Sequence, residues 1–247
     1  MSGRPILRPA IVWLLAGPGM AVAVASAAVL GLFMGDKRRG FWMAAPVYIR
    51  LMGWGFGIER RLEGWEALPL AIREGAPAIF YANHASLLDP PLIVSTLPSR
   101  PVFIAKQELR WVPVLGWAMW LAGFILINRR NQKEAYASLA DAALQIRAGQ
   151  SVAIFAEGTR SQNGEVLPFK RGGFALALDA GVPLVPLAIR GGHEILPKGA
   201  WRTRGGPYVL TVGEPLDPAS FEDPESLRAA AEARLREMLA EQKANCI

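Results

Sequence analysis

A histidine and an aspartate stand five residues apart in the stretch Asn83-His84-Ala85-Ser86-Leu87-Leu88-Asp89-Pro90. A carboxylate that holds one imidazole nitrogen leaves the other as a proton acceptor and stabilises the imidazolium that forms, as a general base for an alcohol requires. The alternative is a turn histidine beside an aspartate that caps a helix. The pair alone therefore suggests, without establishing, chemistry on a hydroxyl group.

The spacing of this pair predicts a bend in the chain. On a continuous helix, residues five apart point about 140° away from each other. A loop must therefore bring His84 and Asp89 together. Asp89 precedes a proline, which suits an N-cap with Pro90 as the first helical residue and a carboxylate that reaches back to the imidazole. A helix that begins at Ser86 instead places Asp89 in its first turn, and both registers are compatible with the sequence.

Two more polar segments follow apolar runs. Residues 156–161, Ala-Glu-Gly-Thr-Arg-Ser, come directly after the run 152–155, and Arg129 follows the run 124–128. Arg160 can grip a phosphate through two parallel donors. A solvated turn with incidental charges is the alternative, because Gly, Thr and Ser are ordinary turn residues. Together, however, the segments place a base, an acid and cations where an α/β sheet collects ligands, at the carboxyl ends of its strands.

The elements that position these residues alternate along the chain after Glu59, which is typical of an α/β domain. We expect a largely parallel, mixed central sheet flanked by helices. Strands are expected at 78–82, 102–105, 124–128, 152–155, 184–189 and 208–212, with 124–128 in a central position. Helices are expected at 113–122, at 131–148 with a capping box of Asn131 and Glu134, and at 224–242 with Asp223 as its cap.

The amino-terminal region is strongly apolar. Residues 11–34 carry no charge and are long enough, as a helix, to cross a bilayer. A cleaved signal peptide is the alternative, but the apolar run continues past its candidate cleavage site at 25–27. Residues 41–57 carry only Arg50 and several aromatic residues, which prefer the headgroup level. We expect residues 1–57 to form a membrane anchor, either one transmembrane helix or two half-embedded interfacial helices, and residues 58–247 to form the catalytic domain.

The composition of the chain indicates which classes of binding partner to expect. A net charge of +6 favours anionic partners, and a mean hydropathy of +0.23 with eight Trp indicates a membrane surface and argues against nucleic acid. The only cysteine, Cys246, excludes an intrachain disulfide and a cysteine metal cluster. With only two histidines, a zinc or iron site is not expected, and no cofactor is implied.

The chain resembles the PlsC-like glycerolipid acyltransferases. The resemblance covers residues of about 60–220 and rests on several ordered blocks, which makes a chance match unlikely. His84 and Asp89 match the family's His, four residues, Asp motif. The other matching segments are 123–129, 155–161 and 182–187, together with Lys106 in 104–109. Two positions depart from the pattern: Ala156 stands where proline is usual, and Asn128 where aspartate is common.

The resemblance implies acyl transfer from acyl-ACP or acyl-CoA to the sn-2 hydroxyl of 1-acylglycerol-3-phosphate, which gives phosphatidate in phospholipid biosynthesis. It implies that His84 is the base and that Asp89 orients it. Lys106, Arg129 and Arg160 would hold the lysophosphatidate phosphate, positioned by Glu157 with Gly158 and Thr159 in the same turn. The catalytic domain is then expected on the cytoplasmic face of the inner or cell membrane.

Three alternatives remain open on the sequence. The acceptor can be another lysolipid, such as lyso-ornithine lipid. The chain can also be a non-catalytic membrane lipid-binding module, although the presence of His84, Asp89, Glu157 and Arg160 together argues against it. An acyl-enzyme route through Ser86 is disfavoured, because a nucleophile two residues from its base rarely shares one carbonyl with it. The donor, the acyl chain length and the oligomeric state are not set by the sequence.

Overall fold

A seven-stranded sheet forms the centre of the computed structural model, which describes residues 9–128 and 131–244. The strand order is β1-β7-β6-β2-β5-β3-β4, and every neighbouring pair is parallel except β6 and β7. The strands are β1 (Ile58–Glu63), β2 (Ile79–Ala82), β3 (Val102–Lys106), β4 (Ile125–Ile127), β5 (Val152–Phe155), β6 (Leu184–Arg190) and β7 (Gly206–Val212). The expected mixed, largely parallel sheet is confirmed.

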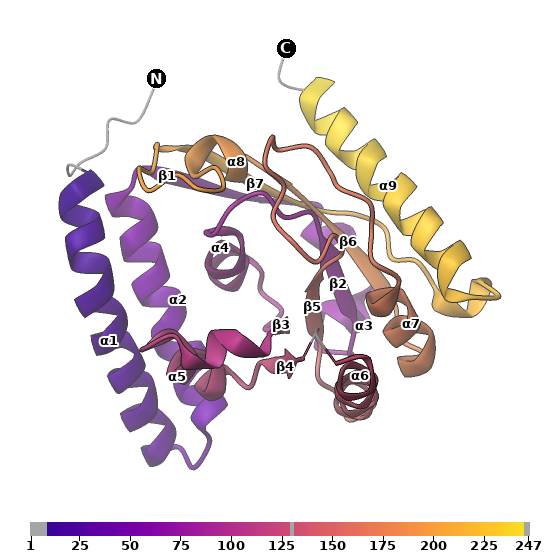
Figure 1. Cartoon of the computed structure of the whole chain (residues 1–247), viewed down its shortest axis with the longest axis horizontal. Helices are drawn as coiled ribbons and strands as arrows, with labels where there is room; N and C mark the ends of the chain where they lie inside the picture. Colours follow the sequence, from indigo (N-terminus) through magenta and orange to yellow (C-terminus); the bar gives the residue numbers. More distant parts are fainter. Residues whose placement is uncertain (1–8, 129–130, 245–247) are drawn as a thin grey trace.

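Helices cover both faces of the sheet (Figure 1). On one face lie α2 (Lys37–Gly55), α4 (Asp89–Thr96) and α5 (Leu115–Ala122), with α1 (Pro9–Phe33) outside α2. The other packs against α6 (Gln132–Arg147), α7 (Arg171–Ala180) and α9 (Pro224–Ala244). The short helices are α3 (Leu70–Arg73), α8 (Gly192–Ile195) and the 3-10 turns η1 (Trp65–Ala67), η2 (Gln107–Trp111) and η3 (Pro218–Ser220).

The central strands are buried on both sides, as a parallel sheet between two helical layers requires. All four residues of β2 are buried, with Phe80 and Ala82 in the core under α2 and α4, and Ile79 and Tyr81 in the core under α7 and α9. The alternation of β2 directs the residue after Ala82 towards the α7 side and the next towards the α4 side. His84 therefore emerges on the α4 side.

The sequence located six of the strands to within two residues, but it missed β1 and expected β4 in the centre of the sheet. The sequence of β1, Ile-Glu-Arg-Arg-Leu-Glu, is mostly charged, because this strand lies at one edge of the sheet with half of its residues exposed. β4 lies at the opposite edge and not in the centre. Its apolar character reflects cover from α6, because Ile125 belongs to the same core cluster as Ala142 and Ile146.

Helix ends follow the predicted capping chemistry. Asn131 accepts a hydrogen bond from the Glu134 N–H at 3.3 Å at the start of α6. Asp223 accepts from the N–H groups of Glu225 and Ser226, both at 2.8 Å, at the start of α9. The helix expected at 113–122 begins at Leu115.

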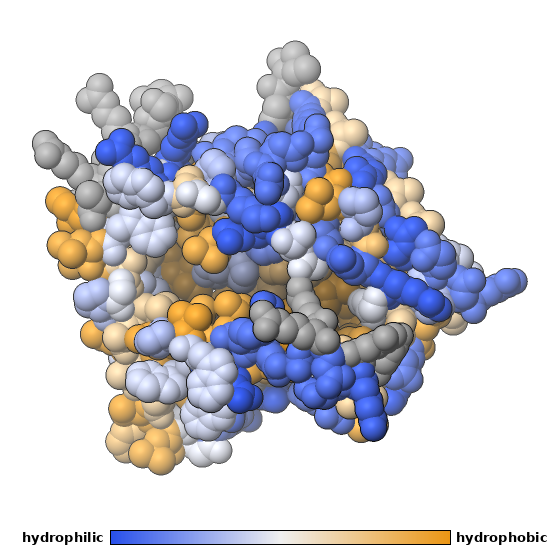
Figure 2. Space-filling view, viewed as in Figure 1, coloured by the Kyte–Doolittle hydropathy of each residue, from blue (hydrophilic) through white to orange (hydrophobic). Residues whose placement is uncertain are grey.

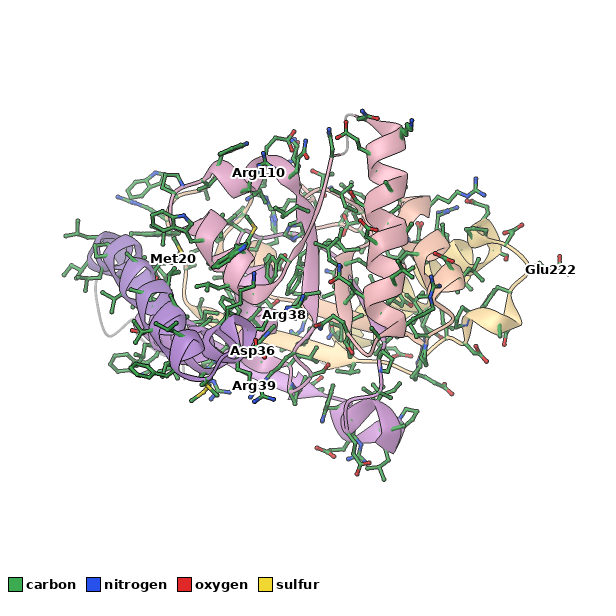
Figure 3. The ribbon with its side chains drawn as sticks, turned by 90° about the horizontal axis from the view of Figure 1, so that it is seen from below. Met20, Asp36, Arg38, Arg39, Arg110 and Glu222 are labelled. Atoms are coloured by element: carbon green, nitrogen blue, oxygen red, sulfur yellow. The ribbon has the colours of Figure 1, made fainter. Side chains whose placement is uncertain are left out.

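The first two helices form an antiparallel hairpin that packs against the α/β body. α1 and α2 cross so closely that a Cβ on Gly40 would lie 2.2 Å from the Ala27 carbonyl oxygen. Asp36 caps α2 at the turn, and the charged turn residues lie beside the body in Figure 3. Arg38 donates to the Gln150 side chain at 3.0 Å. The hairpin therefore touches the α/β body at its turn as well as along α2.

One helical segment, Ile11–Phe33, is long and apolar enough to cross a membrane, and little of it is buried in the protein. Phe41, Trp42 and Phe56, however, belong to the same core cluster as Phe80 of the sheet. The expected boundary at residue 57 thus marks a change in surface character and not a gap between two cores. The division into an anchor and a catalytic domain stays a prediction.

Candidate active site

His84 lies just beyond the carboxyl end of β2, where its neighbour fixes the direction of the chain. The Asn83 side chain accepts from the Ile189 N–H at 2.8 Å and donates to the Ile189 carbonyl at 2.9 Å. This pair extends the β2–β6 pairing by one residue after the strand has ended. The hydrogen bonds of Asn83 therefore fix the position of the His84 backbone independently of any contact of the His84 side chain.

Asp89 meets His84 across a tight turn. Asp89 Oδ2 lies 2.9 Å from His84 Nδ1 and also accepts from the N–H groups of Ala85 at 2.9 Å and Ser86 at 2.8 Å. The carboxylate is completely buried, whereas the imidazole is 15% exposed. A carboxylate oxygen only accepts hydrogen bonds, so Nδ1 donates to Oδ2 and Nε2 is left as the acceptor. This is the arrangement of a histidine base with its orienting carboxylate.

Neither expected helix register is correct. α4 begins at Asp89 itself, with Leu88 as an N-cap that makes no side-chain bond. Asp89 is thus in the first turn and is not the cap, and residues 83–86 are not helical. The reason is that Oδ2 bonds backwards to the turn at Ala85 and Ser86, which leaves it no role in capping the helix that follows.

An aromatic surface supports the imidazole. The His84 ring stacks on Phe155 with centroids 3.8 Å apart and an angle of 17°, and Phe155 in turn lies 5.7 Å from Phe103. In the orientation of Figure 1, the space-filling view shows a hollow with apolar walls between α4 and α5 (Figure 2). Apolar surroundings strengthen the interaction between an imidazolium and a carboxylate.

Glu157 holds the backbone of the base. Its Oε1 accepts from the His84 N–H at 2.7 Å, and its Oε2 accepts from the Leu167 N–H at 2.9 Å. Burial raises the pKa of Glu157 to about 7, although both backbone hydrogen bonds oppose that change. The sequence associates Glu157 with the phosphate-binding cations, but the structure gives it backbone partners instead.

The turn after β5 is tied to His84 a second time. The Ser161 N–H donates to the His84 carbonyl at 2.8 Å. Gly158 has a φ of +68°, which favours glycine, and it separates Glu157 from the exposed Thr159. Arg160 is half-buried in this turn, and its carbonyl accepts from Lys198 Nζ at 3.1 Å. Two bonds to one residue thus bring the whole segment 157–161 to the base.

Lys106, another of the expected cations, lies at the same edge of the sheet. Lys106 ends β3, with its Nζ 3.2 Å from Glu108 Oε1. Lys106 pairs in register with Ile127, the last residue of β4. Arg129 lies outside the described residues. The strand order places β5 between β2, which leads to His84, and β3, which ends at Lys106.

Ser86 does not have the geometry of a nucleophile. Its hydroxyl donates to the Leu196 carbonyl at 2.9 Å, accepts from the Leu88 N–H at 3.2 Å and is completely buried. The second histidine, His193, lies beside Gly164 and shares no hydrogen bond or ion pair with His84 or Asp89, all of which are described residues. Cys246 lies outside the described residues. Among those described, no group of three or more His, Cys, Asp or Glu side chains could hold a metal ion.

Sequence reasoning missed three residues around the pair. Phe155 supports the ring of His84. Gly192 lies against the second carboxylate oxygen of Asp89, because a Cβ built on Gly192 would lie 2.5 Å from Oδ1. The Tyr208 hydroxyl and Asp89 Oδ1 are both buried without a hydrogen-bond partner among the described residues. The glycine pair 191–192 after a strand was the only available sign of this contact.

Comparison with known proteins agrees with this geometry. The sequence model described as Acyltransferase matches residues 61–190, which is more than half of the 247 residues. The chain is 35% identical over 185 residues to human 1-acyl-sn-glycerol-3-phosphate acyltransferase alpha, covering 74% of this chain and 64% of the relative. It is 34% identical over 175 residues to the enzyme of that name from Cocos nucifera, covering 70% and 55%.

A solved structure resembles nearly the whole chain. The crystal structure of the 1-acyl-sn-glycerophosphate (LPA) acyltransferase PlsC from Thermotoga maritima superposes with a TM-score of 0.82 at 28% identity, and covers 96% of this chain and 97% of that one. The chain spans less than two thirds of the length of the two curated relatives above. The likeness to the solved structure extends through the amino-terminal hairpin as well as the sheet.

Proposed function

Because this chain belongs to the Acyltransferase family, we propose that it is a 1-acylglycerol-3-phosphate O-acyltransferase that converts lysophosphatidate to phosphatidate. The observation that carries the proposal is the His84–Asp89 pair, in which a buried carboxylate holds Nδ1 at 2.9 Å and leaves Nε2 free. A base of this kind acts on a hydroxyl, which is the group that lysophosphatidate offers.

The transfer is direct. His84 Nε2 takes the proton of the sn-2 hydroxyl while that oxygen attacks the carbonyl carbon of the acyl thioester. The tetrahedral intermediate collapses with cleavage of the carbon–sulfur bond, and the imidazolium returns its proton to the departing thiolate. Asp89 stabilises the imidazolium and fixes its orientation. The Ser86 hydroxyl is buried and makes two hydrogen bonds, which supports this route over one through an acyl-enzyme.

The phosphate of the acceptor is proposed to bind the cations at the carboxyl edge of the sheet. Arg160 follows β5 and Lys106 is the last residue of β3, the two strands next to β2 along that side, and Arg129 comes after β4 in the sequence. Gly158 and Thr159 shape the turn that carries Arg160. Glu157 positions this turn through the backbone of His84. Acyl-ACP and acyl-CoA both carry the thioester that this mechanism uses.

The protein is proposed to act at an anionic membrane surface, with the catalytic body on the cytoplasmic face of the inner or cell membrane. The exposed apolar surface of α1 and the net charge of +6 support this location. Nucleic acid is not a proposed partner.

An assay with a panel of lysolipids tests the function. Purified protein in detergent is incubated with lysophosphatidate, lyso-ornithine lipid or lysophosphatidylcholine and with acyl-ACP or acyl-CoA. We expect phosphatidate from lysophosphatidate, and a loss of about 10²–10⁴ in rate for His84→Ala. Faster acylation of another lysolipid would show that this lipid, and not lysophosphatidate, is the acceptor. No acylation of any acceptor, or full activity of His84→Ala, would refute the catalytic assignment.

A further inference from the structure

Two arginines from different elements meet at the end of α4 that is remote from Asp89. Arg50 of α2 donates through Nε and Nη2 to the Ser95 carbonyl, both at 3.4 Å. Arg60 of β1 donates through Nη1 to the Ser95 hydroxyl at 3.2 Å and to its carbonyl at 3.5 Å. Ser95 lies six residues after Asp89 on α4, about 9 Å along the helix, so this cluster is separate from the catalytic pair.

The positive charge of this cluster is not balanced by the protein. In the described part of the chain, neither Arg50 nor Arg60 has a carboxylate within ion-pair distance, whereas their neighbour Arg61 pairs with Glu59 at 4.0 Å. Arg60 Nε is buried and has no hydrogen-bond partner among the described residues. Burial lowers the pKa of Arg60, and the charge of Arg50 lowers it further.

The helix end alone is a weak counter-charge. The last carbonyls of a helix carry about half a negative charge, and here they face two guanidinium groups. The four bonds to Ser95 are long, at 3.2–3.5 Å, and leave other N–H donors of both guanidinium groups free to bind a further acceptor. A planar guanidinium pair of this kind matches the oxygens of a phosphate group. The missing partner is therefore an anion.

The surroundings indicate where that anion comes from. Arg50 is exposed within a stripe of apolar side chains on the outer face of α2. The stripe consists of Met43, Val47, Leu51 and Trp54, which are 49%, 56%, 59% and 57% exposed. It continues the exposed apolar surface of α1, which packs beside α2. Tryptophan and arginine beside exposed apolar residues are typical of the headgroup level of a bilayer.

We propose that Arg50 and Arg60 bind the phosphate of an anionic membrane phospholipid whose acyl chains lie along the α2 stripe. A soluble phosphate would satisfy the two guanidinium groups but would leave this apolar stripe without a partner. The bound lipid acts as a docking ligand and takes no part in the acyl transfer.

The test uses full-length protein in detergent, titrated with a fluorescent short-chain phosphatidylglycerol and followed by anisotropy. We expect Arg50→Gln to weaken binding about fivefold, as loss of one cationic contact to an anionic lipid does. The matched control is Arg61→Gln, which removes the same charge from a neighbouring exposed position and should change binding less than about twofold if contact, not overall charge, decides. The zwitterionic phosphatidylcholine of equal chain length should bind more weakly than phosphatidylglycerol.

Three results would overturn the proposal. Equal losses for Arg50→Gln and Arg61→Gln would indicate a diffuse surface potential without a site. Equal affinity for phosphatidylglycerol and phosphatidylcholine would exclude recognition of the anionic headgroup. If inorganic phosphate raised the thermal unfolding temperature in an Arg50-dependent manner while phosphatidylglycerol binding did not depend on Arg50, the ligand would be a soluble phosphate.

Discussion

At the scale of single residues, Asp89 uses its two carboxylate oxygens differently. Oδ2 accepts from His84 and two backbone N–H groups, whereas Oδ1 faces Gly192 without a hydrogen bond. Oδ2, the oxygen that contacts the His84 ring, therefore also closes the turn at residues 84–86. In the proposed mechanism this oxygen also stabilises the imidazolium, so removal of its charge should slow the chemical step more than it weakens substrate binding.

Asp89→Asn tests this dependence. The amide keeps the shape of the side chain but cannot stabilise the imidazolium by charge, and its NH₂ group cannot accept from the turn. We expect kcat to fall by about 10²–10⁴ with little change in KM, measured with lysophosphatidate as acceptor. The exposed Asp179, which pairs with Arg147 on the surface, provides the control variant Asp179→Asn. A rise in KM at constant kcat would contradict this role.

Glu157 gives the fold a specific dependence on pH. Its pKa is about 7 in the folded protein and 4.5 as a free side chain. Between these values the folded state keeps a proton that the unfolded chain has released. The contribution of Glu157 to the free energy of unfolding therefore falls as pH rises through this window, by about 3 kcal/mol in total, and stays low above it.

Thermal unfolding of wild type and Glu157→Gln in detergent at pH 5 and pH 8 measures this contribution. Glutamine does not titrate, so the stability of the wild type relative to the variant should be lower at pH 8 than at pH 5. A difference that is constant with pH would show that Glu157 has an ordinary pKa.

At the scale of elements, the glycine pair after β6 is the wall against which Asp89 packs. A Cβ on Gly191 would lie 2.0 Å from the Pro207 carbonyl oxygen, and one on Gly192 would lie 2.5 Å from Asp89 Oδ1. Because Gly191 has no side chain, α8 can pack closely against β7. Because Gly192 has none, α8 can also pack closely against the Asp89 carboxylate. The β6–β7 segment and the turn after β2 are coupled through these two positions.

Gly192→Ala should displace Asp89 from His84. We expect kcat to fall at least tenfold with KM nearly unchanged, because the variant disturbs the base and not the phosphate-binding turn. Gly17→Ala is the control, since a Cβ there meets no atom within 4 Å. Equal activity of Gly192→Ala and wild type would show that the Asp89 carboxylate can shift without loss of the pair.

Strands whose residues are apolar on both faces could be predicted from the sequence. Strands that form only through pairing with a segment distant in the sequence could not. β2 and β5 are buried runs between turn residues, and their positions follow from composition. β1 is an edge strand that pairs with a strand near the other end of the chain, so its charged sequence carries no local signal. The antiparallel entry of β7 next to β6 is likewise a tertiary property.

The same limit applies to the site. The motif and the positions of the expected strands predicted that His84, Asp89, Arg160 and Lys106 would gather at one edge, because parallel strands end together. The backbone role of Glu157 and the contact of Gly192 with Asp89 depend on distances between loops that are far apart in sequence. No local pattern encodes such distances.

At the scale of the whole molecule, the α1–α2 hairpin lies along the α/β body and does not project from it. Near its start, α1 contacts the end of α2 through Trp13 and Phe56, whose rings are 5.2 Å apart. At the other end of the hairpin, Lys37 lies 3.8 Å over the ring of Trp120 in α5. If α1 stood across a bilayer, the body packed along α2 would be drawn into hydrocarbon. We therefore predict that the hairpin lies in one leaflet.

Cysteine labelling checks this orientation. Ile11→Cys and Leu32→Cys, at exposed positions near the two ends of α1, are introduced separately with Cys246→Ser and reconstituted into sealed vesicles. A hairpin in one leaflet places both cysteines on the same side, so a membrane-impermeant maleimide should label both or neither from outside. Labelling of only one from outside would indicate a transmembrane α1.

The pairing of β1 with β7 has a consequence for biosynthesis. Glu63 and Thr211, which share a hydrogen bond between these strands, are 148 residues apart. At about 5–20 residues per second, the ribosome needs on the order of ten seconds to make the partner strand after β1 has emerged. During that interval the apolar hairpin is complete but its sheet is not. Early contact of the nascent hairpin with lipid would cover its apolar surface while translation continues, so the membrane would serve the polypeptide as a folding partner before it serves the enzyme as a source of substrate.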